Sequence, residues 1–187
     1  MLVFEALLER IAQGLDSRAI PYMVIGGQAV LAYGEPRLTR DVDVTLGVGP
    51  EKLPAILEWA RETGWQVLVQ EPQQFVAQTL VLPCQEPQSG IRVDLIFSLT
   101  PYERQAIERA TTIQIRSIPV RFATVEDLIV LKMVAGRPRD LEDVRGILTR
   151  HKHLNVGYIR QWLAQMEAAY GEEFGARFDE LLGRITR

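Results

Sequence analysis

Three aspartates in the sequence lie within apolar segments, where an ionised carboxylate is costly unless a partner stabilises it. Asp41 and Asp43 lie in the segment DVDVTL, and Asp94 lies in IRVDLIF. Side chains alternate between the two faces of a strand, so Asp41 and Asp43 are expected on one face. Two carboxylates so close together need a cation to stay ionised, and oxygen ligands suit a hard divalent ion. The pair therefore predicts a site for Mg²⁺ (or Mn²⁺).

Asp94 has a simpler explanation that the residues alone leave open. A single acid in an apolar strand requires a partner, and Arg92 or another nearby arginine could supply it as an ion pair. We favour a role in the site for Asp94 over this alternative.

Two glycines, Gly26 and Gly27, follow the apolar run Tyr22–Ile25 and precede a short helical segment at residues 28–33. Glycine lets the backbone approach a ligand closely, and the first N–H groups of a helix point towards an anion such as phosphate. A plain tight turn between a strand and a helix is the alternative. Because the aspartate pair follows in the expected context, we favour a phosphate-binding turn.

The order of these features resembles the signature of the DNA polymerase β-type nucleotidyltransferase superfamily: two glycines, thirteen residues, and then Asp-Val-Asp. The segments GGQAVLAYG and PRLTRDVDV look most like the AbiEii-type nucleotidyltransferases, a branch that includes toxins of bacterial toxin–antitoxin systems. Asp94 stands where the superfamily has a third acid. The segment LKMVAGRPRDLED resembles a helical part of the same branch, in which a lysine and a following acid approach the site. The resemblance extends from about Leu7 to Leu148.

The resemblance implies a role for each matching residue. The catalytic and metal-binding residues would be Asp41, Asp43 and Asp94, and the nucleotide-binding residues would be Gly26, Gly27, Arg40, Lys132 and Asp140. From the residues alone, Lys132 could equally reach the surface or point at an anion. Asp140 is balanced between capping a helix and serving the site, and capping is the favoured role for Asp143.

The implied reaction is a two-metal transfer of a nucleoside monophosphate from an NTP to an acceptor, with release of pyrophosphate. The acceptor could be tRNA or another RNA, a protein, or a small molecule. The alternative is a catalytically weak or inactive antitoxin or regulatory partner, binding a cognate toxin or antitoxin protein. Three clustered acids favour the enzyme, and the glycine turn favours a triphosphate substrate over a metal-dependent nuclease.

The composition is that of an ordinary globular protein and sets only broad limits. The 187 residues suit one domain or a domain with a helical appendage, and the net charge of −3 provides no global attraction to nucleic acid or membrane. Cys84 is the single cysteine, so no internal disulfide can form. Acids near the N-terminus argue against a signal peptide, and no apolar run reaches membrane-spanning length. We therefore expect a cytoplasmic protein without a membrane partner.

Hydrophobic periodicity predicts an α+β part at residues 1–122, followed by a helical region at 123–187. The resemblance implies that the first part is a nucleotidyltransferase core, a mixed sheet flanked by helices. The expected strands are 22–25, 41–46, 65–69, 74–82, 91–97, 112–115 and 118–122. The expected helices are 2–15, 28–33, 51–62, 102–110, 124–135, 140–150, 156–170 and 172–185.

Overall fold

The computed structural model describes residues 2–34 and 38–185, which form two compact units. The first unit comprises Met1–Gln28 and Thr39–Phe122, and the second comprises Ala29–Leu38 and Ala123–Arg187. The chain therefore passes between the units at three points, one of them inside a helix. Each unit is described by itself below.

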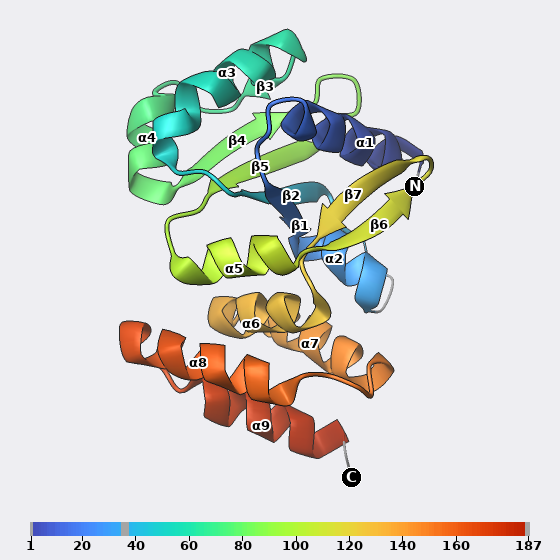
Figure 1. Ribbon diagram of the computed structural model, residues 1–187, viewed down its shortest axis with the longest axis vertical. Coiled ribbons are helices and arrows are strands. Elements are labelled where there is room, and N and C mark those ends of the chain that lie inside the picture. The colour runs from blue at the N-terminus through green and yellow to red at the C-terminus, as the bar shows by residue number, and fades with distance from the viewer. Residues whose placement is uncertain (1, 35–37, 186–187) are drawn as a thin grey trace. The chain divides into compact units, whose positions relative to one another are not determined.

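A mixed β-sheet forms the centre of the first unit, as Figure 1 shows. Within the described residues its strand order is β3-β4-β5-β2-β1-β7-β6. β2 is parallel to β5 and β1 is parallel to β7, whereas the other neighbours are antiparallel. The strands are β1 (Tyr22–Ile25), β2 (Asp41–Leu46), β3 (Gln66–Val67), β4 (Val81–Gln85), β5 (Arg92–Phe97), β6 (Thr111–Ile115) and β7 (Ile118–Phe122).

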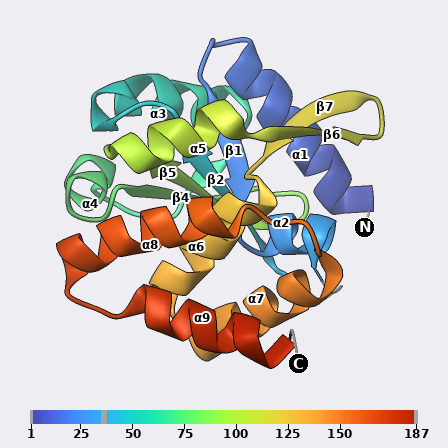
Figure 2. The ribbon, with the colours of Figure 1, turned by 60° about the horizontal axis from the view of Figure 1, so that its bottom comes forward.

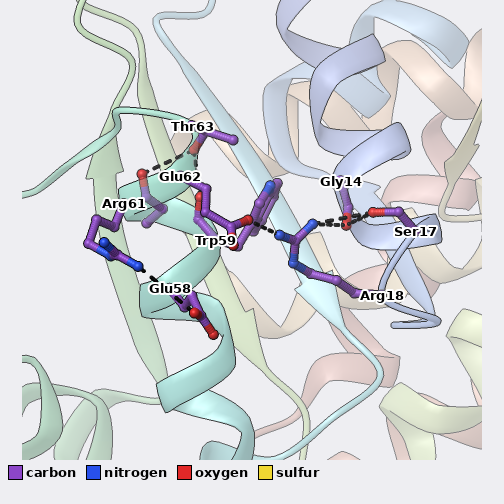
Figure 3. A network of polar contacts seen from close by, with 9 residues as sticks. Gly14, Ser17, Arg18, Glu58, Trp59, Arg61, Glu62 and Thr63 are labelled. Atoms are coloured by element: carbon purple, nitrogen blue, oxygen red, sulfur yellow. Dashed lines mark hydrogen bonds and ion pairs between the residues drawn. The ribbon is translucent and has the colours of Figure 1, made fainter.

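Helices flank this sheet, which confirms the predicted α+β class. They are α1 (Leu2–Asp16), the 3₁₀ turn η1 (Pro50–Lys52), α3 (Leu53–Glu62), α4 (Pro72–Thr79) and α5 (Pro101–Arg109). Figure 3 shows how α1 meets α3: Gly14 leaves room for the Trp59 ring, and Arg18 forms an ion pair with Glu62. The Arg18 guanidinium also lies 5.9 Å from the centre of the Trp59 ring. A side chain at Gly14 would occupy the space of this indole, so the glycine permits the close packing.

Most of the second unit is helical, with α6 at its centre. Its helices are α6 (Val125–Ala135), α7 (Pro138–Arg150), α8 (Val156–Tyr170) and α9 (Phe174–Ile185), and it also holds the larger part of α2 (Gly26–Tyr33). α6 contacts α7, α8 and α9, which explains why its sequence is apolar on nearly every face. Figure 2 shows α8 and α9 side by side within this unit.

The polar contacts of the second unit hold both of its chain segments together. Thr124 caps α6 by accepting a hydrogen bond from the Asp127 N–H group. His151 Nε2 lies 2.7 Å from the carbonyl oxygen of Tyr33, which joins the end of α2 to the end of α7.

One predicted strand is wrong. Residues 74–82 were expected to be extended, but α4 occupies Pro72–Thr79 and β4 begins only at Val81. Pro72 stands in the first turn of α4, where its missing N–H group costs nothing, and Leu80 ends the helix in a left-handed conformation with φ of 60°. The strand predicted at 65–69 is shorter than expected, and only Gln66–Val67 pairs.

Over residues 2–34 and 38–185, no helix combines the length and the apolar character that crossing a membrane requires.

Candidate active site

The pairing of β2 with β5 brings the three predicted acids onto one face of the sheet. Asp43 is directly opposite Asp94, and Asp41 is directly opposite Arg92. Because the strands are parallel and side chains alternate, all four residues point to the same side. The intervening valines, such as Val42, are fully buried on the other side, whereas the acids are half-buried. We call the surface formed by Asp41, Asp43, Asp94 and Arg92 the acid face.

Gly26 lies directly against this acid face. Ile25 pairs with Asp43 at the end of β1, so the next residue enters α2 beside that aspartate. Gly26 has φ of +62°, a conformation that favours glycine, and a Cβ atom there would overlap Asp43 Oδ2. Gly27 follows it inside the first turn of α2 and is buried. The glycine turn and the acids thus form one continuous structure, while its phosphate-binding role stays a prediction.

Each end of the acid face has a polar partner from the protein. The Thr39 hydroxyl donates to Asp41 Oδ1 at 2.8 Å, just before β2 begins. Arg92 Nε donates to Asp94 Oδ1 at 2.8 Å, so the ion pair that the sequence left open is present. Arg40, between Thr39 and the first acid, is exposed. Its predicted contact with the nucleotide is a matter for experiment.

The charges of the acid face act together on their neighbours. The hydrogen bond to Asp94 raises the pKa of Arg92, burial partly opposes this, and the charges of all three aspartates raise it further. Cys84 lies on β4 next to β5, where burial and the charge of Asp94 raise the pKa of the thiol to about 12. The acid face is therefore a region of concentrated negative potential with Arg92 as its cation.

The donor set of the acid face suits the predicted metal in its chemistry. Three carboxylates without nitrogen or sulfur ligands are what Mg²⁺ or Mn²⁺ prefers. In the part of the chain that the structure describes, however, no three acidic, histidine or cysteine side chains already stand together as a metal-binding group. One oxygen of Asp94 is bound to Arg92. The chemistry of Asp41, Asp43 and Asp94 suits the ion, and their role as its ligands stays a prediction.

Lys132 and Asp140 belong to the second unit, where they bind each other. Lys132 Nζ lies 2.8 Å from Asp140 Oδ1 and 2.7 Å from Asp143 Oδ2, and its side chain is only 6% exposed. Arg137 Nε donates to the other oxygen of Asp140 at 2.6 Å. We call Lys132, Arg137, Asp140 and Asp143 the buried ion cluster. Of the two possibilities for Lys132, pointing at an anion is the one observed, and the anions are carboxylates of the protein.

The capping role predicted for Asp143 is wrong, and capping, one of the two roles left open for Asp140, is not observed. α7 begins at Pro138, its N-cap is Arg137, and no side chain caps it. Proline is favourable as the first helical residue, so the helix starts two residues earlier than expected and both aspartates lie inside it. Burial would raise the pKa of Asp140, but hydrogen bonds and charge from Arg137 and Lys132 bring it below its ordinary value.

One residue of interest escaped the sequence analysis. Gln28 follows the two glycines in α2 and is buried, and its Nε2 group has no hydrogen-bond partner within the described structure. A buried amide without a partner is costly, so such a group invites an explanation. The available signal was its position: a glutamine directly after the glycine turn, in an otherwise apolar helix.

Comparison with known proteins assigns the chain to a family. A family model described as "Nucleotidyl transferase of unknown function (DUF2204)" matches residues 4–175. The chain belongs to this nucleotidyl transferase family. This confirms the predicted superfamily, whereas the AbiEii-type branch stays a prediction. No curated protein matches the chain.

Solved structures show the same fold at low sequence identity. An antigenic nucleotidyltransferase-like protein from Paracoccidioides brasiliensis is 16% identical with a TM-score of 0.59, covering 96% of this chain and 91% of that one. The antibiotic-resistance factor ANT(2'')-Ia is 16% identical with a TM-score of 0.64, covering 91% and 94%. The lincosamide antibiotic adenylyltransferase LnuA is 13% identical with a TM-score of 0.51, covering 73% and 91%. At these identities the likeness establishes the nucleotidyltransferase fold.

Proposed function

We propose that this nucleotidyltransferase transfers a nucleoside monophosphate from an NTP to an acceptor hydroxyl and releases pyrophosphate. The observation that carries the proposal is the juxtaposition of Asp43 and Asp94 across β2 and β5, with Gly26 directly against Asp43. Two acids placed opposite each other, beside a glycine whose backbone conformation other residues rarely adopt, would add little to the stability of the fold.

Asp41, Asp43 and Asp94 would hold Mg²⁺ or Mn²⁺. The bound metal would supply the positive charge that balances the triphosphate and the leaving pyrophosphate. Gly26 and Gly27 would present backbone N–H groups at the start of α2 to the phosphates, because the first N–H groups of a helix lack partners within it. The exposed guanidinium of Arg40 would add charge to the phosphate site.

The proposed reaction is a displacement at the α-phosphorus of the nucleotide. The bond from this phosphorus to the pyrophosphate oxygen breaks, and a bond to the acceptor oxygen forms. The hydroxyl proton of the acceptor would pass to a base, and Asp94 is the candidate because a carboxylate on the acid face can accept it. The predicted contact of Lys132 and Asp140 with the nucleotide stays a proposal.

The acceptor and the biological partner are the broadest parts of the proposal. An RNA such as tRNA, a protein, or a small molecule could provide the hydroxyl. The structurally similar ANT(2'')-Ia is an antibiotic-resistance factor, and LnuA is a lincosamide antibiotic adenylyltransferase. These likenesses support including small molecules among the acceptors and testing ATP first. Membership of the AbiEii-type branch, a cognate toxin or antitoxin protein and a cytoplasmic location stay predictions from the sequence.

The first test is calorimetric binding of each of the four NTPs with and without Mg²⁺, followed by measurement of pyrophosphate release with candidate acceptors. We expect one NTP to bind in a Mg²⁺-dependent manner. Asp43→Asn should reduce turnover by at least about 100-fold, because it removes charge that acts at the reacting centre. Asp16→Asn is a matched control, since Asp16 is an exposed carboxylate at the end of α1.

The same test separates the enzyme from the alternative functions. Absence of binding for all four NTPs with either Mg²⁺ or Mn²⁺ would contradict the transferase proposal and favour a regulatory binding partner. Cleavage of RNA without release of pyrophosphate would instead indicate a nuclease.

A further inference from the structure

Arg92 is the residue of the acid face that the proposed reaction does not use. It stands at the first position of β5, directly opposite Asp41, and two residues before Asp94 on the same face. Its Nε lies 2.8 Å from Asp94 Oδ1. The guanidinium therefore binds the one carboxylate that would complete the metal site.

The geometry of this ion pair makes it easy to exchange. The Arg92 side chain is 53% exposed, whereas that of Asp94 is 17% exposed. Solvent screens an ion pair of this kind, and exposed pairs contribute little to stability. A divalent ion on three carboxylates has far more to gain electrostatically than one guanidinium on a single carboxylate. The ion pair can therefore stabilise Asp94 and still open when a metal ion binds.

The charges around Arg92 lead to the same view. Arg92 is directly opposite Asp41 and forms an ion pair with Asp94 on the same face, so its positive charge lies among the carboxylates of the acid face. Without a cation, three carboxylates on neighbouring positions of β2 and β5 would repel one another. Arg92 relieves this repulsion from within the chain.

We propose that Arg92 is an internal cation that competes with the divalent metal ion for Asp94, so that metal binding requires the Arg92–Asp94 ion pair to open. This inference rests on the proposed function, because it presupposes that the acid face binds a metal. It adds a residue that sets metal affinity. Because Arg92 must be displaced, the metal alone would bind more weakly than it would to the same three carboxylates without Arg92.

The test is binding of Mn²⁺ without nucleotide, measured by electron paramagnetic resonance and by calorimetry. Arg92→Gln removes the competing charge and should tighten Mn²⁺ binding by about three- to tenfold, as expected for an exposed charge close to the ion. Arg92→Lys keeps the charge but loses the Nε–H group, so its affinity should lie between those of the wild type and Arg92→Gln. Arg61→Gln, at a 79% exposed arginine of α3, is the matched control and should leave the affinity unchanged.

A second measurement follows the ion pair directly. The ¹⁵N resonance of Arg92 Nε, assigned through its absence in Arg92→Lys, should shift during a Mg²⁺ titration as the hydrogen bond to Asp94 is lost. The same titration should leave the resonance of Arg61 Nε in place. This readout does not depend on turnover or on knowing the acceptor.

Three results are distinguishable. Tighter binding by Arg92→Gln together with the shift of the Arg92 resonance supports the inference. Unchanged or weaker binding by Arg92→Gln, while Asp43→Asn loses Mn²⁺, overturns the inference and leaves the metal site intact. Absence of Mn²⁺ binding in both the wild type and Arg92→Gln overturns the inference together with the metal-dependent part of the proposed function.

Discussion

The acid face of the first unit and the buried ion cluster of the second contain similar residues in opposite circumstances. In the cluster, Lys132 contacts two carboxylates and is 6% exposed. On the acid face, Arg92 is 53% exposed and binds one carboxylate of three. Buried charges must be matched by partners, whereas half-exposed charges can exchange them. Accessibility, more than residue type, therefore distinguishes the group that can exchange a partner within the protein for a ligand.

The largest expected effect breaks the buried ion cluster. Lys132→Met should lower the free energy of unfolding by about 3–5 kcal/mol, because it removes the cation that contacts two buried carboxylates. Urea denaturation followed by circular dichroism measures this. Lys152→Met, at an exposed lysine, is the matched control and should change stability by less than about 0.5 kcal/mol.

Breaking the ion pair on the acid face should have a much smaller effect on stability than breaking the buried ion cluster. Asp94→Asn should change the free energy of unfolding by no more than about 1 kcal/mol, since it breaks only a surface ion pair and also removes a negative charge. A loss as large as that of Lys132→Met would mean that the acid face is also a structural cluster.

Gly26→Ala should cost less stability than Lys132→Met but more than Asp94→Asn. The left-handed backbone and the overlap with Asp43 Oδ2 should together cost about 2–4 kcal/mol. Gly64→Ala is the control: Gly64 has φ of +73°, but a Cβ there meets no atom within 4 Å. Its cost should be only about 1 kcal/mol. The difference between the two variants, measured by urea denaturation, isolates the contact with Asp43, and equal losses would contradict that contact.

The lowered pKa of Asp140 makes the stability of the protein depend on pH. The ionised carboxylate stabilises the folded state, so its contribution is complete above the ordinary aspartate pKa near 3.8 and is lost as the pH falls through the lower value in the folded protein. Asp140→Asn should therefore cost about 1.5–3 kcal/mol at pH 7 and progressively less below pH 4. Urea denaturation from pH 7 to pH 3 tests this, and a constant difference between the two proteins would contradict it.

The smallest expected effect is a gain. Gln28→Met replaces a buried amide by an apolar side chain of similar length. Because Nε2 of this amide has no hydrogen-bond partner among the residues that the structure describes, stability should rise by about 1 kcal/mol. Thermal unfolding measures the gain. If nucleotide binding weakens at the same time, Nε2 of Gln28 donates a hydrogen bond to the nucleotide, and the protein is less stable without the nucleotide because this group is then unpaired. A fall in stability would show that Nε2 has a partner in solution.

The sequence allowed the acid face to be predicted better than the buried ion cluster. The alternation around Asp41 and Asp43 fixes which face they share. The glycine turn indicated that a helix follows, although α2 starts at Gly26 and not at residue 28 as expected. Pairing of Asp43 with Asp94 depends on the register of β2 and β5, which only the folded sheet determines. Lys132 shows the limit more clearly, because its partners lie on another helix and its sequence neighbours do not reveal them.

Two errors in the predicted elements have a common local cause. Pro72 and Pro138 both stand in the first turn of a helix, a position that proline favours. The predicted strand at 74–82 and the predicted helix start at residue 140 did not take this preference into account. In the first case, Val76 is the buried residue of α4, so little of the short helix faces the core and its periodic signal is weak. The proline was the stronger local signal in both segments.

The division of the chain between the units has a consequence for its synthesis. The second unit includes Ala29–Leu38, whereas its remaining residues follow Phe122. On the ribosome, the end of α2 must therefore wait for the whole of Thr39–Phe122 to be made before His151 can meet the carbonyl of Tyr33. Cutting the chain after Phe122 would separate Ala29–Leu38 from the rest of the second unit. The N-terminal fragment would carry this segment without its partners, and the C-terminal fragment would lack it. A fragment designed to reproduce the native second unit should therefore contain residues 29–38, joined to the C-terminal helices by a redesigned connection.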